Sequence, residues 1–591
     1  MDLYPPIIII DQQASMRDFL SFILFSILFI EPSLAQHSRL QRQGITTQLI
    51  VDSKPFLILG GELGNSSATC LDDIKSTFPK LQQIGLNTVL VPVYWELIEP
   101  TEGNFNFTRT DSILSQARMN NLKVVFLWFG AWKNSMSCYT PSWFKEDYTK
   151  YPRAKTEIGK PLEIASLFSE EVYRADNRAF SEWLKHVAEI DKNEGTVIMI
   201  QIENEIGMLE SARDHSQAAN ELFKANVPSE FMEYIQQNKK ELHPWLSDKW
   251  ASNGHKQSGN WQEVFGTDIY TDELFMAWYY AEYVGRLAHT ARSIYDVPLY
   301  VNAAMNSRDR KPGEYPSAGP LAHLIDLWHC AAPDIDFIAP DLYDKGFKNW
   351  VAKYHLHNNP LFIPEIRLTD DNGVRAFYVF GEHHAIGISP FSIEDSSSSP
   401  NSPLTQSYAK LKELMPILTK GQEKGSVKGL LFNEQSKDRI IEDEDLRVTC
   451  RHYFTLPWDP RANDGSTWPE GGGILIKLAE NDYIVAGSGI VLEFAKKTEL
   501  MTQKAKVQLG EDGFTENGKN TNNIKRELNQ KLEGWSGTRC GISFVSEVKV
   551  DKNGNLHEIR RLNGDQTHQG RHVRISVGEF KILHVKLYEY K

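Results

Sequence analysis

Eight short apolar runs alternate with longer amphipathic segments between about residue 45 and residue 425. Several runs are apolar throughout, which is typical of parallel strands covered by helices. Helical periodicity lies between them, as in Cys70–Ile84 and Arg178–Ile190. Eight strands with helical returns predict a (β/α)8 TIM barrel with insertions, an α/β fold. The runs are Phe56–Glu62, Thr88–Trp95, Lys123–Gly130, Val197–Glu205, Leu299–Met305, Phe337–Tyr343, Leu361–Glu365 and Ala385–Phe391.

The pattern divides the chain into a barrel and a second domain. We expect the barrel over residues 36–424, with its largest insertion at about Gly207–Thr271, between the fourth and fifth strands. Three tryptophans of this insertion, Trp245, Trp250 and Trp261, serve either as platforms for a bound sugar or as core packing. After residue 424, short strand-like runs are separated by turn sequences such as Lys552–Asn555. They predict an all-β, sandwich-like C-terminal domain over residues 425–591.

Residues 1–35 have the features of a targeting segment. The apolar run Phe19–Ile30 is too short to span a bilayer, and small residues at Ser33 and Ala35 fit a secretory cleavage site. Residues 1–15 do not resemble the start of such a signal, so we expect Met16 to be the true start. The alternative is an uncleaved anchor. We expect a secreted protein. A vacuolar or lysosomal location is the alternative.

Composition narrows the classes of function. Hydrophobic residues make up 41% of the chain and charged residues 24%, as in soluble globular proteins. The net charge of −13 does not indicate the positively charged surface that binds nucleic acid or anionic lipid. No cofactor motif occurs in the sequence. His355, His357, His383 and His384 lack acidic or cysteine partners at ligand spacing, so we interpret them as surface residues and predict no metal site.

Two acidic motifs end strands of the predicted barrel. Gln201–Glu205 ends the fourth strand, and Glu365 ends the seventh. The strand period of two predicts that Gln201, Glu203 and Glu205 share one face while Asn204 lies on the other. Because catalytic groups of barrel enzymes lie at the carboxyl ends of strands, we expect Glu205 and Glu365 to face each other.

A pair of carboxyl groups placed in this way cuts glycosidic bonds. One carboxylic acid protonates the leaving oxygen, while the other attacks the sugar or activates water. The alternative is that each glutamate is a buried, paired residue of the barrel. That alternative is favoured for Glu203, where a buried partner suffices. For Glu205 and Glu365 their joint position favours catalysis.

Several motifs resemble those of known glycosidases. Gln201–Glu205 resembles the acid/base motif of the four-seven superfamily of retaining glycosidases, in which an asparagine precedes the catalytic glutamate. Trp95–Pro100 followed by Gly103–Phe107 is similar to the second-strand region of family 35 and family 42 β-galactosidases. Gly60–Ser67 and Ala339–Tyr343 resemble a family 35 branch with a β-rich C-terminal domain of uncharacterised role. The resemblance covers roughly residues 45–425.

The resemblance implies roles for four residues. Glu205 is the expected general acid/base and Glu365 the expected nucleophile. Asn204 is expected to hold the sugar 2-hydroxyl, and Tyr343 to donate a hydrogen bond to the nucleophile. A raised pKa suits the acid, and a phenol hydrogen bond favours an ionised nucleophile. The implied function is that of a retaining glycoside hydrolase, foremost an exo-β-galactosidase acting on oligosaccharides or polysaccharide side chains.

The chain departs from the better-known family 35 enzymes where those enzymes hold galactose. They carry Cys-Ala-Glu-Trp on the third strand, where this chain has Trp128–Asn134, and their galactose-binding tyrosine falls near Pro92. These departures leave the sugar open and the bond chemistry unchanged. Further candidates for sugar contacts, each with a structural role as the alternative, are Glu62, Trp132, Asn134 and Asn302.

Two sequons accompany the predicted signal, at Asn65 and Asn106. Asn65 follows the first strand on the catalytic face, where a glycan would block the site. We therefore expect Asn106 to be the better glycan carrier.

Other functions remain as alternatives to the exo-β-galactosidase. One is a related retaining glycosidase with another sugar specificity, and another is a non-catalytic carbohydrate-binding protein on the same barrel. A metal-dependent barrel enzyme is disfavoured, because no cluster of histidines and acids lies at the strand ends. The expected partner is a carbohydrate, with no nucleic acid, cofactor or stable membrane anchor. The sequence does not indicate an oligomeric state.

Overall fold

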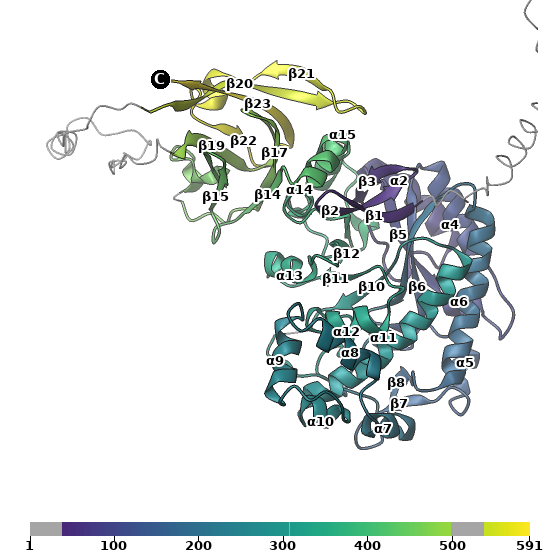
Figure 1. Cartoon of the computed structure of the whole chain (residues 1–591). Coiled ribbons are helices and arrows are strands. Elements are labelled where there is room, and N and C mark those ends of the chain that lie inside the picture. The colour runs from purple at the N-terminus through teal and green to yellow at the C-terminus, as the bar shows by residue number, and fades with distance from the viewer. Residues whose placement is uncertain (1–37, 307, 463, 498–536) are drawn as a thin grey trace, which may run out of the picture.

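The computed structural model describes residues 38–306, 308–462, 464–497 and 537–591 (Figure 1). The predicted signal segment, with its start at Met16, lies outside these residues. Within the described ranges, no helix combines the length and the apolar character that crossing a membrane requires.

Eight parallel strands form the barrel, and their order around it follows the chain. A parallel bridge between Glu62 and Leu90 joins the first strand to the second, so the two ends of the sheet meet. The predicted TIM barrel is thus confirmed. Its strands are β4 (Ile58–Leu59), β5 (Thr88–Tyr94), β6 (Lys123–Lys133), β9 (Val197–Asn204), β10 (Leu299–Ala304), β11 (Phe337–Leu342), β12 (Phe362–Ile366) and β13 (Gly387–Pro390).

Helices return the chain between successive strands and cover the barrel (Figure 1). Each buries an apolar stripe against the strands, as Phe78 and Leu81 do on the first helix. The returning helices are α2 (Leu71–Ile84), α3 (Trp95–Ile98), α4 (Thr108–Met119), α5 (Ser142–Glu146), α6 (Glu170–Asp191), α11 (Ile269–Ile294), α12 (Ile325–Ala331), α13 (Phe347–Tyr354), α14 (Asn372–Glu382) and α15 (Pro403–Lys424). A small hairpin, β7 (Arg153–Lys155) and β8 (Pro161–Ala165), precedes α6.

The insertion after β9 folds as a group of short helices against α11. They are α7 (Gln217–Lys224), α8 (Ser229–Gln237), α9 (Pro244–Ser252) and α10 (Trp261–Phe265). Trp250 and Trp261 are buried there, and Trp261 packs edge-to-face on Phe275 of α11 with ring centroids 5.7 Å apart. These two tryptophans therefore pack the core of the insertion. Trp245 is half-buried and packs edge-on against His323.

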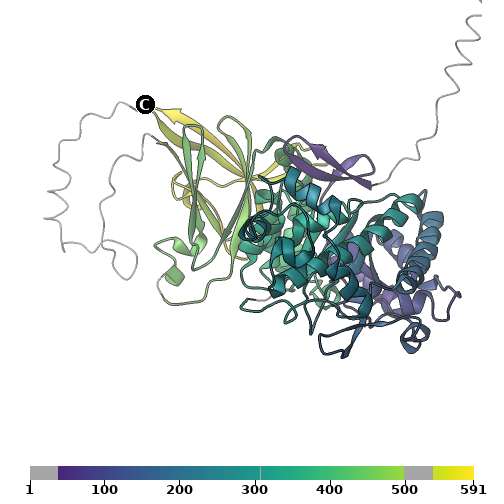
Figure 2. The same ribbon diagram turned by 60° about the horizontal axis from the view of Figure 1, so that its bottom comes forward.

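A three-stranded antiparallel sheet precedes the barrel, formed by β1 (Ser38–Gln43), β2 (Thr46–Val51) and β3 (Lys54–Phe56). The turn between β1 and β2 bonds to the end of α15, since the Ile45 amide donates to the Glu423 carbonyl at 3.1 Å. Both views place this sheet beside α15, between the barrel and the C-terminal sheets (Figures 1 and 2).

Two antiparallel sheets follow α15, as the predicted all-β domain requires. Leu430, Leu475 and Val485 of the larger sheet share one core with Val448 and Leu492 of the smaller sheet, so the two sheets pack as a sandwich. The larger sheet contains β14 (Val427–Phe432), β17 (Gly471–Ala479), β18 (Asp482–Ser488), β20 (Arg539–Val550), β21 (Leu556–Arg561) and β23 (Lys581–Tyr590). The smaller sheet contains β15 (Asp438–Asp443), β16 (Leu446–His452), β19 (Ile490–Lys496) and β22 (Val573–Ile575).

The larger sheet is buried on its second face as well. Leu431, Ile474 and Ile484 alternate along their strands with the sandwich residues and belong to the same core as α14 and α15. Side chains of a strand alternate between faces, which explains why these strands are nearly continuous in hydrophobicity. The larger sheet therefore packs on helices of the barrel with one face and on its partner sheet with the other.

Two glycines set the distance between α14 and β14. A Cβ atom added to Gly429 would lie 2.5 Å from the Tyr378 carbonyl oxygen and 2.6 Å from the Glu382 amide nitrogen. A Cβ on Gly381 would lie 2.8 Å from the Gly429 Cα atom. Both clashes are with backbone atoms, which cannot move aside by a change of rotamer. The helix and the strand are thus in backbone contact.

We expect Gly429→Ala to lower the free energy of unfolding by about 1–3 kcal/mol, because the added methyl group overpacks this contact. A shift of the urea midpoint measures the effect. Lys428→Ala, at the exposed neighbouring position of β14, is the control and should change stability by less than about 0.5 kcal/mol. Equal midpoints for the two variants would contradict the close packing of α14 on β14.

Candidate active site

The two predicted carboxylates lie at the carboxyl end of the barrel. Glu205 directly follows β9, and Glu365 is the fourth residue of β12. Both side chains are buried, with 5% of each residue exposed. They are near enough for the charge of Glu205 to raise the pKa of Glu365. The barrel therefore brings together the pair that the sequence motifs indicate.

Two more acids join this pair and form a carboxyl cluster of Glu62, Glu205, Asp341 and Glu365. The side chain of Glu62 is in hydrogen-bonding contact with Glu365, and that of Asp341 with Glu205. Glu62 Oε1, Asp341 Oδ1 and Glu365 Oε2 have no conventional donor among the described residues. Two carboxyl groups in contact need at least one proton between them, so each contact includes at least one carboxylic acid.

The pKa directions identify which members of the cluster hold the protons. Burial, followed by the charge of Glu365, raises the pKa of Glu62 well above its ordinary value. Burial and the charges of Glu365 and Glu205 do the same to the pKa of Asp341. At neutral pH, Glu62 and Asp341 are therefore neutral acids in contact with Glu365 and Glu205.

Burial raises the pKa of Glu365 to about 7, and the charge of Glu205 adds to this effect. Lys133, the hydroxyl of Tyr343 and the side chain of Glu62 act in the opposite direction and lower it. The expected phenol hydrogen bond is present, since Tyr343 donates to Glu365 Oε1. It favours the ionised form as predicted, but it does not outweigh burial.

Lys133 and Asp341 belong to the site although sequence reasoning assigned them no role. Lys133 ends β6, is 3% exposed, and has its Nζ 5.0 Å from the ring centroid of Phe129. Its charge lowers the pKa of both Glu62 and Glu365. Asp341 precedes Tyr343 by two residues near the end of β11, so the strand period of two is the sequence signal that could have found it.

The asparagine candidates fall into two groups. Asn134 donates to Glu205 Oε2, while Asn302 accepts from the Glu205 amide at 2.9 Å and donates to Asp341 Oδ2 at 2.7 Å. These two orient the carboxyl groups. Asn204 differs, because its side chain is fully buried and neither amide atom has a partner among the described residues. A buried unpaired amide is costly, so Asn204 is the asparagine available to a ligand.

The predicted alternation along Gln201–Glu205 is wrong. Glu203 and Glu205 have left-handed backbone, with φ of 58° and 45°, so the strand period ends before them. Glu203 accepts from the amides of Ala131 and Trp132 at 3.3 and 2.7 Å and contacts Asp176 of α6. Burial and Asp176 raise the pKa of Glu203 well above its ordinary value. Glu203 is thus the buried, paired residue that the structural alternative favoured, but its partner is another acid.

Trp132 lies in a packing position. Its indole is fully buried and meets Tyr280 and Tyr283 of α11 edge-to-face, with ring centroids 5.6 and 4.9 Å apart. It therefore lies between β6 and α11, where the structure gives it no contact with the carboxyl cluster. Within the part of the chain that the structure describes, no group of three or more histidines, cysteines or acids could hold a metal ion.

Comparison with known families matches two parts of the chain. Residues 68–275 match the family model described as β-galactosidase, of glycoside hydrolase family 42. This segment contains β5, β6 and β9 with Asn204 and Glu205, whereas Tyr343 and Glu365 lie beyond it. Residues 404–574 match a domain of unknown function, and they include α15 together with most of the sandwich.

Individual proteins give more distant likenesses. A β-galactosidase of Xanthomonas manihotis is 26% identical over 179 residues, which is 29% of this chain and 27% of the relative. Two solved structures are each 14% identical: the β-galactosidase of the psychrophilic Marinomonas ef1, with a TM-score of 0.42, and the β-mannanase of the blue mussel Mytilus edulis, with a TM-score of 0.37. The alignments cover 61% and 64% of this chain, and 60% and 97% of those chains. The chain thus spans about a quarter of the sequence relative and less than two thirds of the first structure. Over residues 68–275, it is similar to β-galactosidases.

Proposed function

We propose that the chain is a retaining glycoside hydrolase that removes terminal β-D-galactose from oligosaccharides or polysaccharide side chains. The observation that carries the proposal is the carboxyl cluster, in which Glu205 and Glu365 lie together at the carboxyl end of the barrel. The unpaired amide of Asn204 and the β-galactosidase family match over residues 68–275 support it.

The mechanism uses the two glutamates in turn. The Glu365 carboxylate attacks the anomeric carbon while the Glu205 carboxylic acid gives its proton to the departing oxygen, so the glycosidic bond breaks as the glycosyl–enzyme ester forms. Glu205, now a carboxylate, then takes a proton from water, and that water cleaves the ester and releases the sugar with its configuration retained. Asn204 binds the 2-hydroxyl, and Tyr343 holds the nucleophile in place.

We expect Glu365→Gln to lower kcat on nitrophenyl β-galactoside by at least about 10³-fold, because an amide cannot form the ester. Glu205→Gln should lose about 10²–10⁴-fold on the same substrate. It should lose far less on the dinitrophenyl galactoside, because that leaving group departs without a proton. Steady-state kinetics on both substrates separate the nucleophile from the acid.

The control for these variants is Glu96→Gln, at a partly exposed glutamate outside the cluster, which should keep normal rates. An active Glu365→Gln enzyme would contradict the site assignment. Testing wild type on a panel of nitrophenyl β-glycosides decides the sugar. Activity on a different sugar that also depends on Glu365 keeps the mechanism and replaces galactose. A folded wild-type protein that is inert on the whole panel favours the carbohydrate-binding alternative.

A second prediction concerns pH. Because Glu365 must be ionised to attack and its pKa is about 7, kcat/KM should fall as the pH drops below about 7. Lys133→Met removes a charge that lowers this pKa, so the acidic limb of the profile should move to higher pH. Lys145→Met, which removes a lysine that pairs with Glu96, should leave the limb in place. An acidic limb unchanged by Lys133→Met would contradict the electrostatic role of Lys133.

We also propose that the protein is secreted and carries a glycan on Asn106. Asn106 is exposed and lies just before α4 in the chain, whereas Asn65 is half-buried and follows the first barrel strand. Expression in a secreting eukaryotic host should give a mobility shift on deglycosylation that Asn106→Gln removes and Asn65→Gln leaves. The reverse result would assign the glycan to Asn65.

A further inference from the structure

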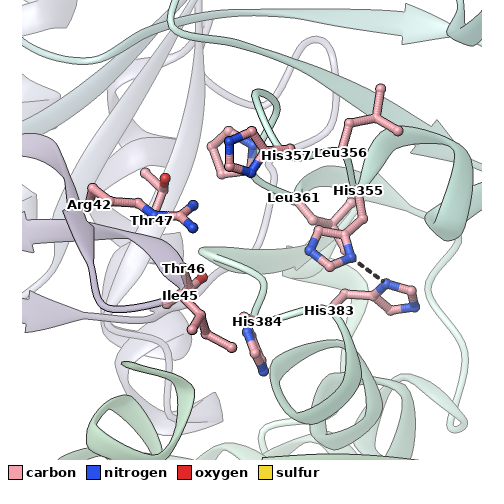
Figure 3. A pocket seen from close by; sticks show the side chains of 11 residues that line it. Arg42, Ile45, Thr46, Thr47, His355, Leu356, His357, Leu361, His383 and His384 are labelled. Atoms are coloured by element: carbon pink, nitrogen blue, oxygen red, sulfur yellow. Dashed lines mark hydrogen bonds between the residues drawn. The ribbon is translucent and has the colours of Figure 1, made fainter. Parts of the chain in front are cut away.

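A pocket of about 260 Å³ is drawn in Figure 3. Its lining precedes β12 and β13, so it lies at the amino end of the barrel, whereas the carboxyl cluster lies at the carboxyl end. Three segments form it: the tip of the β1–β2 hairpin, the loop from α13 to β12, and the turn from α14 to β13. Ligand pockets for drug-sized molecules measure about 300–1,000 Å³. This pocket lies just below that range, so it has room for a small ligand and is too small for an oligosaccharide.

The polar lining of this pocket is basic, and no carboxylate lines it. Arg42 forms no ion pair and no side-chain hydrogen bond with the described residues, and the same holds for the side chains of Thr47 and His357. Figure 3 shows the Arg42 guanidinium pointing from the hairpin toward the histidines on the other side. The polar side chains used here are Arg42, Thr47, His355, His357, His383 and His384.

His355 and His357 are exposed, as the surface interpretation predicts, whereas His383 is buried, which the interpretation did not predict. His383 is only 8% exposed, and its Nδ1 lies 3.0 Å from His355 Nδ1. One proton lies between the two nitrogens, so one ring donates and the other accepts. The second nitrogen of the His355 ring faces the pocket in Figure 3. If His355 takes up a proton, this nitrogen becomes a donor while the bond to His383 remains.

The charges around the histidines are positive on balance. Glu382 faces all three of His355, His383 and His384, but it is already paired with Arg439 at 2.8 Å and also accepts from the Gly429 amide. Lys428 adds a positive charge near His384, and Arg439 adds one near His383. Tyr378 contacts His383 Nε2 at 3.3 Å through its neutral hydroxyl. The site is therefore electropositive and has unused donors.

We propose that this pocket binds a small doubly charged oxyanion of the sulfate or phosphate class between Arg42 and the His355–His383 pair. The planar guanidinium offers two parallel N–H donors to such an ion, Thr47 adds a hydroxyl, and the imidazoles supply further N–H groups. The bound ion ties the β1–β2 hairpin to the loops below β12 and β13.

Binding of the anion is coupled to proton uptake. Burial, together with the neighbouring positive groups, lowers the pKa of His383 and of His384 to about 4, and burial also lowers that of His355. These rings are therefore neutral at pH 7, and an anion favours their charged forms. Since the folded pKa values are depressed, the unfolded chain takes up protons below about pH 6.5 that the free folded protein does not, and its stability falls as the pH drops. The bound anion offsets this cost, so affinity rises as pH falls, by up to about tenfold per pH unit for one proton.

Sulfate is the best probe because it stays doubly charged throughout the relevant pH range. Calorimetric titration of the full-length protein with sodium sulfate, at constant ionic strength set by sodium chloride, should show one saturable site with Kd near or below about 1 mM at pH 6. Titrations in buffers of different ionisation enthalpy should show proton uptake. Inorganic phosphate and a sugar phosphate are the further arms. Tighter binding of the sugar phosphate identifies an ester as the ligand, and equal binding identifies the free ion.

Variants locate the site. Arg42→Ala should weaken sulfate binding at least about tenfold, and His355→Gln should remove most of the pH dependence while sulfate still binds. His384→Gln is the second choice if His355→Gln does not fold. The control is His289→Gln, at an exposed histidine paired with Asp334, which should bind normally. No saturation by about 10 mM sulfate, or saturation unaffected by Arg42→Ala, would overturn the proposal.

Discussion

The burial of four acids in the carboxyl cluster constrains the residues and backbone around it. Four acids cannot be buried together as anions, because each unpaired charge would cost several kcal/mol. The structure resolves this by pairing each proposed catalytic glutamate with a neutral acid, Glu62 with Glu365 and Asp341 with Glu205. Lys133 supplies the nearby positive charge, and the backbone of β9 leaves its regular path at Glu203, just before Glu205.

These pairings place a proton beside each of the two glutamates of the proposed mechanism. In that mechanism, Glu365 no longer presents a full negative charge to Glu62 once it forms an ester, and Asp341 is positioned to donate to the carboxylate that remains when Glu205 gives up its proton. Hydrogen bonds to a developing charge are stronger in a buried site than in water. The neutral acids thus follow the charge as it moves between the two glutamates.

The sequence predicted the barrel strands, the sandwich and the pair Glu205 and Glu365, because each of these follows from periodicity or from the ends of strands. It did not predict the path of Glu203, whose left-handed φ breaks the strand period and whose partner Asp176 lies on a helix that precedes β9. Trp132 has the sequence position of a site residue, but its ring packs on α11. The histidines around the pocket come from two segments, 28 residues apart at His355 and His383, that are brought together by the pairing of β12 with β13.

The backbone contact between Gly381 and Gly429 bears on how Glu365, the proposed nucleophile, is held. Helix α14 begins six residues after Ile366, the end of the strand that carries Glu365, and its outer face rests on β14 and β17. The larger C-terminal sheet thus supports α14, the helix that follows the strand carrying Glu365. The sandwich is therefore a structural support of the barrel that holds the carboxyl cluster, and a protein cut at residue 424 would leave Glu365 on a strand whose following helix has lost its support.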